Sequence, residues 1–160
     1  MPEFTHLDGE KARMVDVSAK CEVYRRAVAS GTIHLRSDTV TAIREGEIVK
    51  GNVLATARVA ATLAVKDTPR IIPMCHAIPV HGIEIDFSFK PENITSTVTV
   101  ISAGKTGVEM EALVGVSTAL LTIWDMVKSA EKDENGQYPV TGISDIRVIE
   151  KVKQTLPETG

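Results

Sequence analysis

The amino-acid sequence predicts an α+β domain in which helices cover one face of an antiparallel sheet. Residues 82–90 alternate apolar and polar side chains, and after a turn at 91–93 a second β-rich stretch returns through 94–102, which together indicate a hairpin. Residues 106–128 repeat apolar side chains at helical spacing. With a strand expected at each end of the chain, one sheet with helices packed on it is the simplest arrangement.

Composition limits the classes of protein to which the chain can belong. The 160 residues are expected to form one domain, 1–160, with 43% hydrophobic and 24% charged residues, an ordinary globular balance. A net charge of −3 argues against a general nucleic-acid binder. No apolar run of membrane-spanning length and no leader stand out, so we expect no membrane partner. Cys21 and Cys75 are far apart, which predicts free thiols in a reducing cytoplasm.

The first part of the chain combines a polar segment with a basic one. Residues 1–20 are polar, with a turn expected at Asp8-Gly9, and are a candidate for mobility; 14–17 fit either a short strand or a loop that orders on binding. Residues 22–35 predict the first long strand. A basic cluster of Lys20, Arg25 and Arg26 lies just before the apolar half of this strand. It is either a solvated basic edge or a clamp for a phosphate-like anion.

Two helices are expected next. Ser37 is the expected N-cap of a short helix at 39–44, and Gly46 its stop. Residues 53–66 are rich in alanine and predict a second, tightly packed helix, with Pro69 beyond its end. Lys50 precedes this helix, where the helix dipole disfavours a cation, and such local inconsistencies are more common at functional sites.

A stiff loop is expected to present Cys75 and His76, which stand between Pro73 and Pro79. A zinc site would need His81 and Glu84 as further ligands, and a metal-dependent hydrolase built on them is the least favoured alternative. A nucleophilic cysteine usually takes its base from elsewhere in the fold, so the adjacency of Cys75 and His76 does not favour that chemistry.

The stretch from Gly104 to Lys128 combines a glycine-flanked turn with the long helix. GKTG resembles a P-loop, but Thr99 stands where the first glycine of that motif is needed. Thr106 and Glu109 fit a capping box, which would start the helix at 106. The helix carries an apolar stripe of Leu113, Val116, Leu120, Ile123 and Val127, and a small, polar stripe of Glu111, Gly115, Thr118, Thr122 and Asp125. The second stripe indicates that something packs closely against it, and the alternatives are an exposed face or a helix contact made by small residues.

A last strand at 143–152 and a frayed tail at 155–160 complete the expected order. With strands at 22–35, 82–90, 94–102 and 143–152, this order resembles the ferredoxin-like β-α-β-β-α-β unit.

Five collinear motifs resemble those of the MoaC family, the cyclic pyranopterin monophosphate synthases of molybdenum-cofactor biosynthesis. They are MVDVSAK (14–20), KGNVLATARVA (50–60), IPMCHAIP (72–79), GKTGVEMEALVGVS (104–117) and LTIWDMVK (121–128). Departures are mild: Trp124 stands where the family usually has Tyr, Ala77 where Pro is common, and Ser129 where Ala is usual.

The resemblance implies a lyase that converts 3′,8-cyclo-7,8-dihydro-GTP into cyclic pyranopterin monophosphate and releases pyrophosphate. It implies a hexamer built from dimers, with the pocket at a dimer interface, and a radical enzyme that supplies the substrate. No redox cofactor or protein-bound metal is expected; magnesium would come only with the substrate triphosphate. A guanine-nucleotide-binding regulator without catalysis is the alternative.

The resemblance also assigns site residues by position. The catalytic ones are Asp125, Lys128 and Lys50. The substrate-binding ones are Met74, Cys75, His76, Glu109, Met110, Glu111, Lys20 and Arg25.

Overall fold

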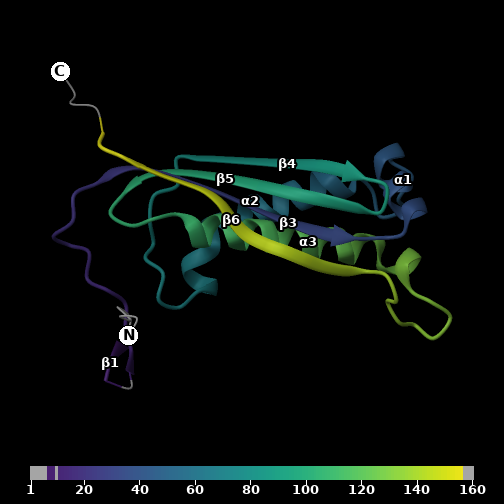
Figure 1. The fold of residues 1–160 in the computed structure, drawn as a ribbon, viewed down its shortest axis with the longest axis horizontal. Helices are drawn as coiled ribbons and strands as arrows, with labels where there is room; N and C mark the ends of the chain where they lie inside the picture. The colour runs from purple at the N-terminus through teal and green to yellow at the C-terminus, as the bar shows by residue number, and fades with distance from the viewer. Residues whose placement is uncertain (1–6, 10, 157–160) are drawn as a thin grey trace.

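A four-stranded antiparallel sheet with helices on one face is the fold in the computed structural model, which describes residues 7–9 and 11–156 (Figure 1). The strands β3 (Val23–His34), β4 (Gly82–Lys90), β5 (Asn93–Gly104) and β6 (Gly142–Gln154) lie in the order β4-β5-β3-β6. The helices are α1 (Ser37–Glu45), α2 (Val53–Ile71) and α3 (Glu109–Glu131). This order confirms the predicted α+β, ferredoxin-like arrangement.

The central strand β5 shows why the sheet has one covered and one polar face. Its side chains at Ile94, Val98 and Val100 are fully buried against the helices. On the opposite face Thr95 shares a hydrogen bond of 2.9 Å between hydroxyl groups with Thr32 of β3. Alternation of apolar and polar residues therefore sets which face of the sheet receives the helices.

Two glycines let the helices approach their neighbours closely. A Cβ atom at Gly115 of α3 would lie 2.8 Å from Val65 of α2 and 3.1 Å from Val98 of β5. A Cβ atom at Gly31 of β3 would lie 2.8 Å from Val116 of α3. The small stripe of α3 is thus, at Gly115, a helix–helix and helix–sheet contact made possible by a missing side chain.

Three predicted helix ends were wrong. Helix α2 runs on to Ile71 with Pro69 inside it, because Thr68 keeps the last turn closed: its hydroxyl donates to the Ala64 carbonyl (3.1 Å) and its carbonyl accepts from the Ile72 N–H (2.8 Å). The N-cap of α1 is residue 36 rather than Ser37, and Gly46 ends the helix in the left-handed conformation, as predicted. Helix α3 begins at Glu109 without a side-chain cap, so the predicted capping box at Thr106 does not form.

Helix α3 contains 23 residues, as many as the predicted stretch 106–128. Its 23 residues are long and apolar enough to span a membrane by length and composition, contrary to the expectation of no such run. Half of the apolar window is buried inside the domain, against the sheet and α2, which is the packing of a core helix.

The N-terminal segment contains no strand at 14–17, so that alternative was wrong. A short antiparallel pair, β1 (Leu7–Asp8) and β2 (Lys11–Ala12), instead flanks the predicted turn, where Gly9 has a φ of 65°. The expected mobility of 1–20 and fraying of 155–160 fall partly outside the described residues.

Candidate functional site

A cavity of about 510 Å³ lies at the end of the sheet where β3 begins and β5 ends. All eight predicted substrate-binding residues line it: Lys20, Arg25, Met74, Cys75, His76, Glu109, Met110 and Glu111. They come from the start of β3, the loop after α2 and the first turn of α3. The sequence therefore identified one spatial cluster from three distant motifs.

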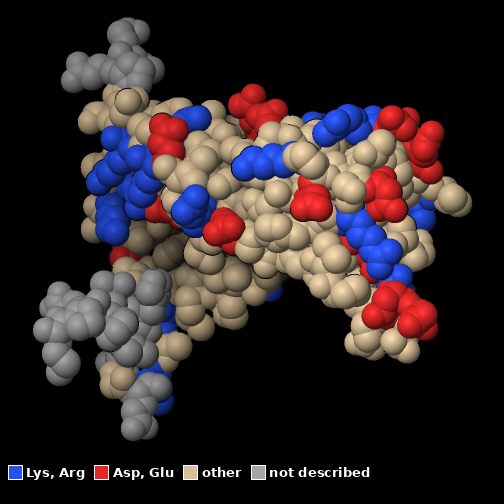
Figure 2. Space-filling model, turned by 45° about the vertical axis from the view of Figure 1, so that its right-hand side comes forward, with Lys and Arg blue, Asp and Glu red and all other residues tan. Residues whose placement is uncertain are grey.

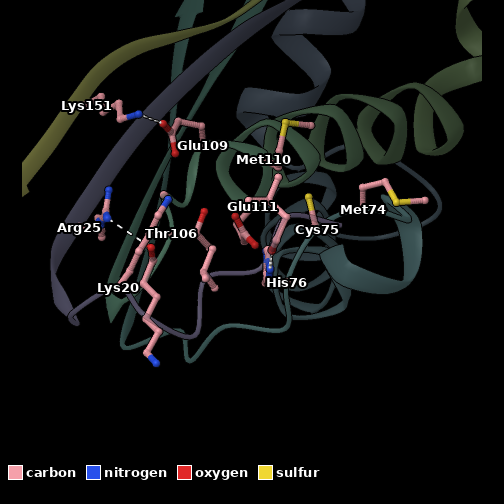
Figure 3. Close-up of a pocket in the computed structure, with 14 residues that line it drawn as sticks. Lys20, Arg25, Met74, Cys75, His76, Thr106, Glu109, Met110, Glu111 and Lys151 are labelled. Carbon is pink, nitrogen blue, oxygen red and sulfur yellow. Dashed lines mark hydrogen bonds and ion pairs between the residues drawn. The ribbon is translucent and has the colours of Figure 1, made fainter. Parts of the chain in front are cut away.

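The cavity has a cationic side and a side of carboxylate, sulfur and imidazole groups (Figure 3). Lys20, Arg25, Lys105 and Lys151 supply the cations, and Lys and Arg side chains gather at the left-hand end of the molecule in Figure 2. Arg25 donates to the Lys105 carbonyl through Nη2 at 3.5 Å, while its buried Nε–H has no partner among the described residues. An unpaired buried N–H is a donor available to an anionic ligand.

Two glutamates in the first turn of α3 have opposite electrostatic surroundings. Burial alone would raise the pKa of Glu109, but the ion pair with Lys151 and the charge of Arg25 outweigh it and hold that pKa below its ordinary value. Burial raises the pKa of Glu111, and the charge of Glu109 adds to the effect. Glu109 is thus held as a carboxylate, while Glu111 is closer to holding a proton.

Burial, followed by the charge of Glu111, also raises the pKa of the Cys75 thiol. A thiol of raised pKa is a poor nucleophile at neutral pH, because the thiolate is the reactive form. This agrees with the view that Cys75 contacts a ligand rather than attacks it.

The loop that carries Cys75 and His76 is fixed to β5 at its far end. The His81 N–H donates to the Ile101 carbonyl (2.8 Å), and the Ala103 N–H donates to His81 Nδ1 (3.1 Å). The Ser102 hydroxyl donates to the Pro79 carbonyl (2.6 Å). His81 therefore anchors the loop. Among the described residues no three His, Cys, Asp or Glu side chains are grouped to hold a metal ion.

The predicted catalytic residues form a second cluster. Asp125 accepts from Lys128 Nζ through Oδ1 (2.7 Å) and from Lys50 Nζ through Oδ2 (3.4 Å), and Lys50 Nζ also donates to the Asp125 carbonyl (2.8 Å). The hydrogen bond and charge of Lys128, followed by the charge of Lys50, lower the pKa of Asp125. The hydrogen bond that Lys128 donates to the Asp125 carboxylate, followed by the charge of that carboxylate, raises the pKa of Lys128. The spacing in the sequence predicted the contact between Asp125 and Lys128, and the structure adds Lys50 to it.

The two clusters do not meet within one chain. The binding cluster begins at the N-terminal end of α3, and the catalytic cluster lies near its C-terminal end. Asp125 follows Glu111 by fourteen positions, which at 1.5 Å per residue corresponds to about 21 Å along the helix axis. The Lys50, Asp125 and Lys128 side chains are also roughly half-exposed in the single chain.

Sequence reasoning missed several residues that line the cavity: Val15, Val17, Lys105, Thr106 and Lys151. The GKTG turn could have identified Lys105 and Thr106. Nothing in the alternating last strand distinguishes Lys151 from its neighbours. The two interpretations of the basic cluster apply to different residues. Lys20 and Arg25 line the cavity, as an anion clamp would, whereas Arg26 forms an ion pair of 2.9 Å with Glu150.

Comparison with known proteins places this chain in a family. A model of the MoaC family matches residues 14–154. The chain belongs to the MoaC family. A relative from Methanospirillum hungatei is 82% identical over 98% of this chain and 100% of its own length, and one from Methanosphaerula palustris is 72% identical over 96% and 99%. Both carry the name probable cyclic pyranopterin monophosphate synthase.

A further member of the family, from Methanothermobacter thermautotrophicus, is 60% identical over 98% of both chains. It is named a probable cyclic pyranopterin monophosphate synthase accessory protein.

Proposed function

We propose that the protein is a cyclic pyranopterin monophosphate synthase of molybdenum-cofactor biosynthesis, a lyase that acts on 3′,8-cyclo-7,8-dihydro-GTP and releases pyrophosphate. The observation that carries the proposal is the division of the cavity into a cationic side and a side of carboxylate, thiol and imidazole groups. Membership of the MoaC family supports it, as do the names of the relatives.

The cationic side suits the triphosphate of this substrate. Lys20, Arg25 and Lys105 present ammonium and guanidinium donors, and the Arg25 Nε–H is unpaired within the described part of the chain. In the proposed cyclisation a substrate hydroxyl loses its proton and attacks the α-phosphorus, while the bond from that phosphorus to the pyrophosphate oxygen breaks. The cations stabilise the charge that develops on the departing pyrophosphate. Magnesium, if it takes part, arrives with the triphosphate.

The other side of the cavity suits the purine-derived ring. Glu111 and His76 offer a carboxyl group and an imidazole to the polar edge of the ring. Met74 and Met110 supply polarisable contacts for its flat faces. The rearrangement is redox-neutral, so acid–base groups are sufficient in this proposal.

The cluster of Lys50, Asp125 and Lys128 supplies proton transfer. Asp125 contacts both lysines and so fixes two ammonium groups relative to one another, one of which can give a proton while the other holds charge. In water the ion pair keeps Lys128 protonated, and enclosure by a second subunit would favour its neutral, basic form by desolvation.

Each complete active site is built in this proposal from two copies of the chain. One copy supplies the cavity, and the other supplies the catalytic cluster, because about 21 Å of α3 separates the two within a single chain. A hexamer made of dimers, as the family resemblance implies, provides such interfaces.

Turnover of the cyclised GTP derivative, followed by pyrophosphate release and by pterin fluorescence after oxidation, tests the activity. Asp125→Ala and Lys128→Ala are expected to lose about a hundredfold or more of kcat, the usual contribution of a general acid or base. The control Lys132→Ala changes a lysine of the neighbouring turn, whose charge lies over the Tyr138 ring, and is expected to stay near wild type. Tight binding without product from the wild type would instead favour the nucleotide-binding regulator.

Mixing two inactive variants tests the shared site. Glu111→Ala disables the cavity, and Asp125→Ala disables the catalytic cluster. After the subunits are unfolded and refolded together, half of the random dimers hold one intact site, so about a quarter of wild-type activity should return. If the mixture stays as inactive as its components, the active site is not shared in this way.

A further inference from the structure

A segment of the chain without regular structure lies against the cavity and contacts two of its residues. We call residues 15–20 the strap. Its Val15 carbonyl lies 2.7 Å from His76 Nε2, and its Ser18 carbonyl accepts from Lys105 Nζ at 2.9 Å. Val15 and Val17 are half-buried in the cavity wall, whereas Met14 is 52% exposed.

The strap has its own internal hydrogen bonds. Asp16 Oδ1 accepts from the Ser18 N–H at 2.8 Å, and the Val17 carbonyl accepts from the Lys20 N–H at 3.0 Å. These bonds close two consecutive turns just after Val15, so the direction of the Val15 carbonyl is fixed locally as well as by its contact with His76.

The contact with Val15 decides which nitrogen of a neutral His76 ring carries the proton. A backbone carbonyl can only accept, so Nε2 must donate and therefore bears the hydrogen. In the neutral ring Nδ1 then holds the lone pair, and it is the nitrogen left to accept a proton or a hydrogen bond from a ligand.

We propose that the strap is a positioning element that holds neutral His76 as the Nε2–H tautomer through the Val15 carbonyl, so that Nδ1 is the acceptor presented to the ligand. The consequence of this tautomer for catalysis rests on the proposed function, whereas the tautomer itself does not. The positioning group is a backbone atom of Val15, and its location depends on the burial of the Val15 and Val17 side chains.

The first test is ¹⁵N NMR of the full-length protein labelled at histidine, at a pH where the imidazoles are neutral. Protonated and unprotonated ring nitrogens resonate in separate ranges, so the spectrum reports the tautomer. His76 is identified as the signal that disappears in His76→Gln. His81 is an internal reference, because its Nδ1 accepts from the Ala103 N–H and its tautomer does not depend on the strap.

Wild-type His76 is expected to show a protonated Nε2 and an unprotonated Nδ1. The double variant Val15→Gly/Val17→Gly removes both half-buried valine side chains of the strap. It is expected to move His76 towards a mixture of tautomers, with His81 unchanged. Met14→Gly adds the same backbone freedom at an exposed position and should leave His76 as in the wild type. If the double variant does not fold, Val17→Gly alone makes the same comparison.

Kinetics supply the second test. The double variant is expected to lose about fivefold to tenfold in kcat/KM, the size of one misplaced hydrogen bond, and Met14→Gly to stay within about twofold. A protonated Nδ1 in the wild type, or unchanged His76 signals in the folded double variant, would overturn the proposal. A wild type that shows the expected tautomer but no turnover would overturn the proposed function and leave the positioning of His76 standing.

Discussion

Substitution of Glu131 by alanine should destabilise the domain more than most single changes. Glu131 is the last residue of α3 and is fully buried. Its carboxylate accepts from the Arg36 backbone N–H at 3.2 and 3.3 Å and from the Thr141 hydroxyl at 2.6 Å. It therefore joins the end of α3 to the start of α1 and to the residue before β6.

The expected magnitude follows from the donors left behind. Alanine leaves the Arg36 N–H and the buried Thr141 hydroxyl unsatisfied, each at about 1–3 kcal/mol, so Glu131→Ala should cost about 3–5 kcal/mol. In a domain of this size that corresponds to a fall in Tm of about 10 °C. Glu131→Gln keeps one acceptor oxygen and should cost less, about 1–2 kcal/mol.

Urea unfolding at one fixed protein concentration measures the change, because the stability of an oligomer depends on concentration. The control Glu134→Ala removes an exposed carboxylate from the adjacent turn and should change the free energy of unfolding by no more than about 0.5 kcal/mol. If Glu131→Ala and Glu134→Ala unfold at the same urea concentration with the same slope, the reasoning from buried donors is refuted.

Two further predictions concern the core and the cavity. Gly115→Ala gains helix propensity but places a Cβ atom 2.8 Å from Val65, so a net loss of about 1–3 kcal/mol is expected in urea unfolding; a gain in stability would show that α2 moves aside freely. Because the pKa of Glu111 is raised, its carboxyl group stays protonated to a higher pH in the folded chain than in the unfolded chain. This group therefore stabilises the fold at pH values below the pKa that it has in the unfolded chain, and that contribution is lost as the pH rises through its pKa in the folded chain. Glu111→Gln should therefore flatten the profile of unfolding free energy against pH in that range. The same variant should speed alkylation of Cys75 at neutral pH, because it removes a charge that raises the pKa of the Cys75 thiol. An unchanged alkylation rate and an unchanged stability profile would contradict this prediction.

The regular elements were predictable because local pattern and tertiary packing agree in them. Alternation in β4 and β5 and the apolar stripe of α3 match the buried faces, and Gly46 ends α1 as its conformational freedom suggests. The ends of α2 and α3 were not predictable from local signals. Pro69 is accommodated by the bonds of Thr68, and Thr106 lines the cavity instead of capping the helix.

The site was predictable where a motif kept its residues close in sequence, and less so where the sheet brought them together. Asp125 and Lys128 lie one helical turn apart, so their contact followed from spacing. Lys151 reaches Glu109 only because β6 lies next to β3 at the edge of the sheet. The pairing of the Val15 carbonyl with His76 involves a backbone atom, which leaves no signature in side-chain chemistry.

The uninterrupted helix between Glu111 and Asp125 restricts where insertions and deletions can be accepted in this chain. Inserting or deleting one residue there would move the second cluster by about 1.5 Å along the axis and rotate it by about 100° around it relative to the first. The turn at residues 132–141, by contrast, leaves both clusters in place when it grows or shrinks. Insertions and deletions should therefore preserve activity after α3 and abolish it within α3. A library of single-codon insertions across residues 105–141 would test this difference directly.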